Sequence, residues 1–227
     1  MSAARGDRAE NPDPLLVACA LRIEQAALRS SGRGARAAPP PAFALLRTGM
    51  GPRAAERAVG SALEGPGMDR AAVLATGFCA GLVPGMHPGD LVVAEQTRDP
   101  QGTVTCTGTA LLAEALARAA PGRTVHTGAL TGSDHVVRGQ ERAQLRATGA
   151  IAVDMESAAT LWTATRAGGS PSGTVRPVAA VRVIVDAPEH ELVRIGTVRG
   201  GISAFRVLRA VLPAFYDWHR SLLLPRR

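Results

Sequence analysis

The sequence predicts a single α/β domain built on a mainly parallel sheet. Its 227 residues, 46% of them hydrophobic, are enough to bury one sizeable core. Short apolar runs that end in glycine or other small residues alternate with amphipathic segments along the chain. This alternation is typical of strand–helix units, in which each helix returns the chain to a parallel strand. We therefore expect residues 1–227 to form one domain, with residues 1–13 as a disordered tail.

Strands are expected where apolar runs are bounded by turn residues, and helices where apolar residues recur every three or four positions. The predicted strands cover residues 15–20, 44–50, 72–77, 90–95, 124–130, 150–153 and 178–185. The predicted helices cover residues 52–63, 110–120, 139–148 and 155–166, and a long one begins at about Ile202. Glycine and proline predict surface loops over residues 30–41 and 166–177.

The net charge of +7 does not predict a nucleic-acid partner. Every basic side chain is an arginine, and the arginines are scattered along the chain instead of forming one stripe. Aromatic residues make up only 3% of the chain, which leaves few side chains for base stacking. The absence of lysine also excludes Schiff-base chemistry.

The sequence predicts a cytoplasmic protein with no membrane span and no metal. No apolar run reaches the roughly 18 residues that a span needs, and the first residues are too polar for a signal peptide. The three cysteines, Cys19, Cys79 and Cys106, contain no C-x-x-C pair. They therefore indicate neither a disulfide framework nor a zinc site.

Three acidic residues follow predicted buried strands, at the positions where α/β proteins gather their chemistry. They are Glu24, Glu156 and Asp186. Any one of them alone is explained as an acid in the first turn of a helix, and Asp154 is expected to cap the helix that follows it. Three such carboxylates, together with glycine-rich turns that let the backbone approach a ligand, predict a binding or catalytic site.

Six segments in chain order resemble the motifs of the purine nucleoside phosphorylase/nucleosidase superfamily. They are "VACALRIEQAALR", "RTGMGPRAAERAV", "ATGFCAGLVPGMHPGDLVV", "TGALTGSDHVV", "AVDMESAA" and "VRVIVDAP". The resemblance spans about Val17 to Leu212 and is strongest to the hydrolase branch, methylthioadenosine/S-adenosylhomocysteine nucleosidase and its relatives. It implies a nucleoside phosphorylase-like fold, a three-layer α/β/α sandwich around a mixed, mainly parallel central sheet. It also implies a homodimer, because the nearest hydrolase relatives pair that way.

The resemblance assigns roles to the acidic residues. Glu156 is expected to bind the ribose hydroxyls while Met155 packs against the sugar. Asp186 is expected to give a proton to N7 of the leaving purine, and Glu24 to orient and activate water. Such a proton donor is a carboxyl that burial, or bonding in its neutral form, keeps protonated. Carboxylates near the ring stabilise the oxocarbenium-like sugar as the N-glycosidic bond breaks.

Other residues are expected to shape the pocket. Phe78, Val136 and Val137 are predicted to contact the base or the 5′ group, and Gly49, Gly51 and Gly77 to form backbone turns at the site. Val136 stands where methylthioadenosine enzymes have an aromatic residue, and Val185 where they have serine. The more apolar pocket resembles that of the hopanoid-pathway relatives, which implies adenosylhopane as a possible substrate.

Water is the expected co-substrate. Phosphorylases of the superfamily carry a Gly-Asp-Pro-x-Arg segment after the first strand, whereas this chain has "CALRIEQ" with Glu24. A carboxylate there would repel phosphate. Arg22 keeps a phosphate-dependent purine nucleoside phosphorylase as an alternative, and a methylthioadenosine/S-adenosylhomocysteine nucleosidase is another. The reaction implies no metal and no organic cofactor.

A hypothesis of another class is a non-catalytic nucleoside-binding module, because a fold alone does not certify a function. The presence of Glu24, Glu156 and Asp186 together favours the enzyme, since a binding module has no need for both the acid and the base.

Overall fold

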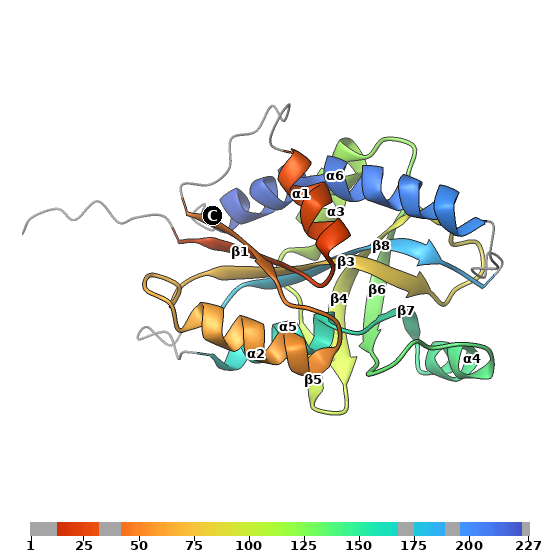
Figure 1. Cartoon of the computed structure of the whole chain (residues 1–227), viewed down its shortest axis with the longest axis horizontal. Helices are drawn as coiled ribbons and strands as arrows, with labels where there is room; N and C mark the ends of the chain where they lie inside the picture. Colours follow the sequence, from red (N-terminus) through yellow and green to blue (C-terminus); the bar gives the residue numbers. More distant parts are fainter. Residues whose placement is uncertain (1–12, 32–41, 168–174, 189–195, 224–227) are drawn as a thin grey trace, which may run out of the picture.

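The computed structural model describes residues 13–31, 42–167, 175–188 and 196–223 and shows helices on both sides of a mixed sheet (Figure 1). In chain order the elements are β1 (Leu15–Cys19), α1 (Arg22–Ser31), β2 (Phe43–Arg47), α2 (Pro52–Leu63), β3 (Ala72–Gly81), β4 (Leu91–Asp99), β5 (Gly102–Thr105), α3 (Thr109–Ala119), β6 (Val125–Gly132), α4 (Gln140–Ala147), β7 (Ala150–Asp154), α5 (Ser157–Arg166), β8 (Val178–Asp186) and α6 (Gly196–Leu222).

The sheet has the strand order β2-β1-β3-β7-β6-β4-β5, and β8 pairs with both β3 and β4. The pairs β1–β2, β1–β3, β3–β8, β4–β6 and β6–β7 are parallel, whereas β3–β7, β4–β5 and β4–β8 are antiparallel. The sheet is therefore mixed and mainly parallel, as expected. Because β3, β8, β4, β6 and β7 pair in turn and β7 returns to β3, these five strands close a ring.

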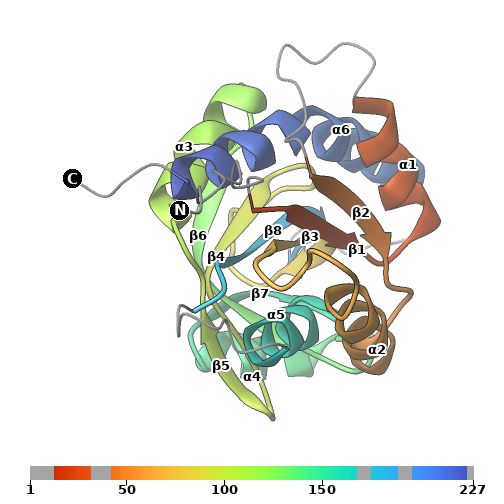
Figure 2. The ribbon, with the colours of Figure 1, turned by 90° about the vertical axis from the view of Figure 1, so that its left-hand side faces the viewer.

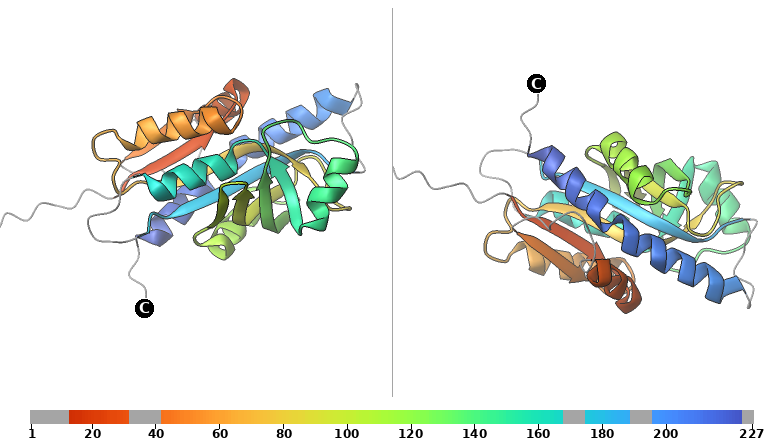
Figure 3. Two further views of the ribbon diagram at one scale, coloured as in Figure 1. Left: turned by 90° about the horizontal axis from the view of Figure 1, so that it is seen from below. Right: turned by 90° about the horizontal axis from the view of Figure 1, so that it is seen from above.

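The helices form two layers. In Figure 2, α1, α3 and α6 lie on one side of the sheet, and α2 and α5 lie on the other; the two views of Figure 3 show these sides separately. Alternate residues of β1 point to the two layers: Leu15 and Val17 join the core under α6, and Leu16 and Ala18 join the core under α2 and α5. A strand covered on both faces is apolar at every position, which explains its unbroken apolar run.

Two elements were not predicted from the sequence. The helix α1 buries Glu24, Ala27, Leu28 and Ser31, which follow a helical spacing. Two of these four residues are polar, so the sequence does not show the periodic apolar pattern that predicts a helix. The strand β5 has only four residues and is held by antiparallel pairing with β4. The predicted tail and most of the two predicted loops lie outside the described residues. Within the parts of the chain that are described, no helix is both long and apolar enough to cross a membrane.

Candidate active site

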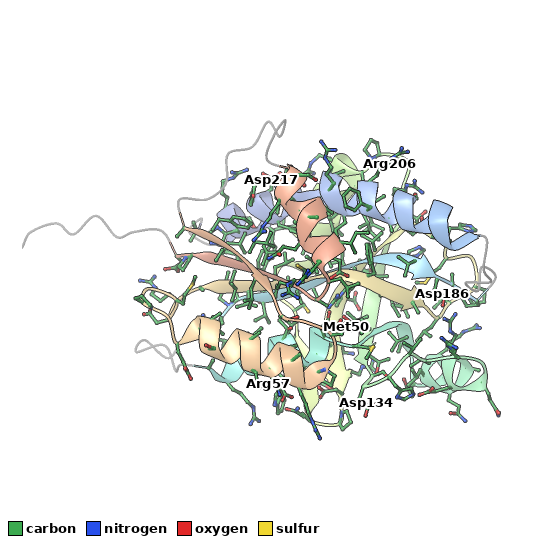
Figure 4. All side chains as sticks on the ribbon, viewed as in Figure 1. Met50, Arg57, Asp134, Asp186, Arg206 and Asp217 are labelled. Carbon is green, nitrogen blue, oxygen red and sulfur yellow. The ribbon has the colours of Figure 1, made fainter. Side chains whose placement is uncertain are left out.

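A cavity of about 260 Å³ brings the three predicted carboxylates together, because Glu24, Glu156 and Asp186 all line it. Glu24 comes from α1, Glu156 from the start of α5 and Asp186 from the end of β8. Met50, which Figure 4 labels together with Asp186, also lines this cavity. The other predicted contact side chains, Phe78, Val136, Val137 and Met155, line it as well.

Glu24 is held rigidly at this cavity. Its side chain is buried, and its Oε2 accepts hydrogen bonds from the backbone N–H groups of Ala20 (2.9 Å) and Leu21 (2.8 Å). Its Oε1 accepts a third from the N–H of Phe78 at 2.9 Å. Burial raises the pKa of Glu24, although the charge of Arg182 and the three N–H donors oppose this effect. The carboxylate is thus fixed in place and more basic than an exposed glutamate.

Gly77 makes room for this carboxylate. Its φ is +137°, in the region that favours glycine, and a Cβ at this position would lie 2.5 Å from Oε1 of Glu24 and 2.6 Å from Nη1 of Arg182. Any side chain would therefore displace both charged groups. The predicted turns at Gly49 and Gly51 also have positive φ angles, 85° and 87°.

Arg182 lies in the middle of β8 and is 1% exposed. Its Nε donates to Oγ of Ser157 (2.8 Å), and its Nη1 donates to the carbonyl of Thr76 (3.0 Å). Its Nη2 forms an ion pair with Oδ2 of Asp154 at 2.5 Å, and Nη1 lies 3.9 Å from Oε2 of Glu156. Arg182 was not predicted from the sequence, although a charged residue inside the apolar run "VAAVRVIV" is itself a signal for a buried, paired group.

Three carboxylates surround the buried guanidinium of Arg182. Burial disfavours the charged guanidinium, but the carboxylates of Asp154, Glu156 and Glu24 outweigh this effect and raise the pKa of Arg182. Asp154 also accepts a hydrogen bond from the N–H of Ser157, the first residue of α5, although the N-cap position itself is held by Glu156 and not by Asp154 as predicted. Arg182 thereby joins β8 to the acidic segment before α5.

Glu156 faces the cavity from the N-terminal end of α5. Its Oε1 accepts a hydrogen bond from the N–H of Gly51 at 2.9 Å, so the glycine turn positions the carboxylate through the backbone. Burial raises the pKa of Glu156, Arg182 lowers it, and the neighbouring Asp154 raises it further. Met155 precedes it and is partly exposed at the same cavity.

Asp186 has a cationic partner that was not predicted from the sequence. Its Oδ2 forms an ion pair with Nη2 of Arg142, a buried residue of α4. Nε of Arg142 also donates to the carbonyl of Val137 at 3.3 Å. The segment "QERAQLRA" contains two arginines, and nothing in the sequence singles out the one that turns inward.

The rest of the wall is largely apolar. Val137 is buried and Phe78 is partly buried, whereas Val136 is 63% exposed. His135 lines the cavity too, but its ring is exposed and pairs with Asp134 and Glu141. In the described ranges, no group of three or more His, Cys, Asp or Glu side chains is placed to hold a metal ion.

Comparison with known proteins identifies structures of the same fold. The methylthioadenosine/S-adenosylhomocysteine nucleosidase of Neisseria meningitidis, solved with methylthio-immucillin-A, is 20% identical, with 92% of this chain and 99% of that chain covered and a TM-score of 0.67. The S-adenosylhomocysteine nucleosidase of Streptococcus pyogenes, solved with 5-methylthiotubericidin, is 19% identical, with 92% and 98% covered and a TM-score of 0.71. The methylthioadenosine/S-adenosylhomocysteine nucleosidase of Colwellia psychrerythraea 34H, solved with adenine, is 16% identical, with 91% and 96% covered and a TM-score of 0.69.

These low identities show a shared fold, which confirms the predicted fold class. A search of curated proteins found no match. The family is shown by the sequence itself, because residues 42–213, more than half of the chain, match the model of the Phosphorylase superfamily. The chain therefore belongs to the Phosphorylase superfamily.

Proposed function

We propose that this protein is a nucleosidase that hydrolyses the N-glycosidic bond of a 5′-substituted purine nucleoside and releases adenine. The observation that carries the proposal is the convergence of Glu24, Glu156 and Asp186 on one cavity in a member of the Phosphorylase superfamily. The nucleosidases that share its fold, one of them solved with adenine, support a purine nucleoside as the substrate.

Glu24 is the proposed base. As the bond between C1′ and N9 breaks, its electron pair goes to the purine, and the oxygen of water adds to C1′ while Glu24 takes a proton from that water. Burial raises the pKa of Glu24, which makes its carboxylate a better proton acceptor. Each carboxylate oxygen has two lone-pair sites, so the backbone bonds to Glu24 still leave it able to accept from water.

Glu156 and Met155 are the proposed ribose-binding residues. The N–H of Gly51 occupies Oε1 of Glu156, and the carboxylate retains acceptor sites for ribose hydroxyls. The thioether of Met155 is a soft apolar group suited to pack against the sugar. Asp186 lies at the same cavity and is the proposed source of the proton that N7 of the purine receives.

Water is the proposed nucleophile. The negative carboxylate of Glu24 would repel a phosphate anion that approached the sugar. Arg182, the buried cation nearby, has Nε, Nη1 and Nη2 all engaged with protein groups, so it does not offer a free guanidinium to phosphate. Arg22, which left the phosphorylase alternative open, is exposed on α1.

The 5′ substituent is proposed to be lipophilic, as in adenosylhopane. Phe78, Val136, Val185 and the 66% exposed Met50 give the cavity an apolar wall. A second cavity of about 500 Å³ favours the alternative, a methylthioadenosine/S-adenosylhomocysteine nucleosidase. It shares His135 and Met155 with the first cavity. Its lining includes charged residues that could meet a polar 5′ group, namely Arg53, Glu56, Asp99, Asp134 and Glu141.

We also propose a cytoplasmic homodimer. Met50 and Val136 are exposed apolar side chains at the cavity, and a second subunit covering them would enclose the 5′ group. Light scattering after size-exclusion chromatography measures the mass directly, and a monomer at micromolar concentration would contradict the dimer.

The experiment that tests the function is release of free base from a panel of nucleosides, each with and without phosphate. The panel contains methylthioadenosine, S-adenosylhomocysteine, adenosine, inosine and a lipophilic 5′-alkyl adenosine. We expect adenine without phosphate and the fastest release from the lipophilic substrate. Strict dependence on phosphate would make the protein a phosphorylase. Binding of adenine without turnover of any substrate would favour the binding module.

A further inference from the structure

We propose that the outer side of α1 and its surroundings dock on an anionic membrane. The docking surface, here called the α1 face, is made of exposed side chains from three elements, Arg22, Ile23 and Arg29 of α1, Arg47 of β2 and Arg209 of α6. The inference deepens the proposed function and rests on it. A nucleoside with a lipophilic 5′ group partitions into membranes, so an enzyme that hydrolyses it has to collect it there.

The two sides of α1 have opposite characters. Glu24 is the only acid of the helix, and it is buried on the inner side, where it lines the candidate active site. Arg22, Ala26 and Arg29 are exposed and follow the spacing of one helical face. The helix therefore holds the proposed base inward and presents positive charge outward.

A surface hollow of about 610 Å³ gathers arginines that are far apart in the sequence. Its lining contains no acid and consists of Arg22, Gln25, Ala26, Arg29, Ser30 and Arg47. Arg209 lies beside the end of α1, because the hydroxyl of Ser31 donates to the Arg209 carbonyl. The fold thus brings together four cations that the linear sequence shows as scattered.

The positive charge of the α1 face is not compensated by the protein. Within the described parts of the chain, no carboxylate forms an ion pair with any of its four arginines. Asp217, an exposed acid of the neighbouring helix α6, is already paired with Arg220. An external anionic partner would supply the missing negative charge.

A lipid surface is the anionic partner that fits the side chains of this face. Ile23 is 50% exposed and directly follows Arg22, so a large apolar side chain stands among the cations. Peripheral membrane proteins use this combination, in which arginines meet lipid phosphates while apolar side chains enter the acyl boundary. The α1 face has no aromatic side chain on which nucleic-acid bases would stack.

The α1 face adjoins the candidate active site. Leu21 and Met50 line the cavity; Arg22 directly follows Leu21, and Arg47 precedes Met50 by three positions. A membrane bound at the face therefore lies close to the cavity, and a lipophilic nucleoside can enter without exposing its apolar group fully to water. The face does not include Met50 or Val136, the side chains that the proposed second subunit would cover.

Co-sedimentation with vesicles tests the docking. Vesicles of phosphatidylcholine alone are compared with vesicles of equal parts phosphatidylcholine and phosphatidylglycerol. We expect binding only to the anionic vesicles, and release when the salt concentration rises from about 0.05 M to about 0.5 M, because salt screens the attraction. Equal binding to both kinds of vesicle would overturn the proposal.

A matched pair of variants distinguishes a specific face from net charge. Arg22→Gln/Arg29→Gln removes two charges from α1, and the control Arg57→Gln/Arg146→Gln removes two from exposed positions of α2 and α4, which lie across the sheet (Figures 1 and 4). Each arginine near an anionic surface contributes about fivefold, so the α1 variant should bind the anionic vesicles about 30-fold more weakly. The control should bind like the wild type. Equal losses in both variants would refute a specific face.

Ile23→Ser distinguishes a membrane from a partner held by charge alone. It keeps the net charge, and it should weaken binding to the anionic vesicles several-fold because Ile23 no longer leaves water on docking. Unchanged binding would contradict the proposal. Tighter binding to a DNA duplex than to the vesicles, at the same salt concentration and lost in Arg22→Gln/Arg29→Gln, would assign the face to nucleic acid instead.

Activity measurements separate this inference from the proposed function. Arg22→Gln/Arg29→Gln should hydrolyse a soluble 5′-substituted adenosine like the wild type. It should release adenine about 30-fold more slowly from a lipophilic 5′-alkyl adenosine held in the anionic vesicles. A wild type that releases adenine from no nucleoside would contradict the proposed function. A wild type that hydrolyses soluble nucleosides but does not bind anionic vesicles would contradict only the docking.

Discussion

Replacing Arg182 with methionine should destabilise the protein, and the loss should grow with pH. Methionine keeps most of the length of the side chain but removes the charge. Asp154, Glu156 and Glu24 remain buried, but they lose the cation that interacts with all three of them. It also frees Oγ of Ser157, which is bound to Nε at 2.8 Å.

The expected loss is about 3–5 kcal/mol of the free energy of unfolding at neutral pH, the usual cost of removing one partner from a buried ion pair. Coulomb's law gives a similar size, about 4 kcal/mol for unit charges about 4 Å apart at an effective dielectric constant of about 20. Arg182 lies 2.5 Å from Asp154 and 3.9 Å from Glu156. Because a domain of this size loses about 2–4 °C in Tm per kcal/mol, the melting temperature should fall by roughly 6–20 °C.

The pH dependence follows from proton linkage. Burial raises the pKa of Glu24 and of Glu156 above the ordinary value of 4.5, and Arg182 is the strongest opposing influence on both. Without Arg182 both pKa values rise further. The folded variant then holds protons that the unfolded chain releases above about pH 4.5, so its free energy of unfolding falls more steeply as pH rises. The deficit relative to the wild type should be smallest near pH 4.5 and largest at pH 7–8.

Urea denaturation at several pH values between 4.5 and 8 measures this deficit directly. The matched control is Arg176→Met, because buried Arg176 donates to five backbone carbonyls, which do not titrate. Its loss should be the same at every pH. If Arg182→Met showed an equally flat pH dependence, the argument that Arg182 compensates buried carboxylates would be wrong.

Three further predictions concern Gly77, Glu156 and His219. Gly77→Ala should abolish most adenine release, because the new Cβ would lie 2.5 Å from Oε1 of Glu24. The control is Gly85→Ala, where φ is +81° and no atom lies within 4 Å of the new Cβ. This control should lose only about 1–2 kcal/mol of stability and keep its kcat/KM unchanged. Glu156→Gln should raise KM for the nucleoside about 10-fold or more, because the ribose loses a charged hydrogen-bond acceptor. The Kd of adenine, measured by calorimetry, should stay the same. A weaker adenine complex would place Glu156 at the base instead. Burial lowers the pKa of His219, so the unfolded chain binds a proton below about pH 6.5 that the folded protein does not. The free energy of unfolding should therefore fall as pH drops from 7 to 5. In urea denaturation His219→Leu should show a smaller fall, and a fall as large as that of the wild type would exclude His219 as the cause.

Much of the fold could be predicted because local patterns determine it. The strands β1 and β8 are apolar at almost every position since both of their faces are covered, and the predicted helix at 52–63 coincides with α2. The helix α1 escaped prediction because Glu24 and Ser31 occupy two of its four buried positions. A polar residue that is buried for a functional or capping reason weakens the periodic signal on which such predictions depend.

Residue types and spacings alone were enough to predict most of the strands and helices in their order, and the three acids that line the cavity. Those follow from residue types and short spacings, which each segment carries without its partners. The tertiary structure alone decided which cations meet these acids. Arg182 contacts Thr76 across 106 positions, and Arg142 contacts Asp186 across 44. Arg142 and Arg146 lie one turn apart on the same polar helix and are chemically identical, so only the packing of α4 against the end of β8 decides which of them is buried and which remains in solvent.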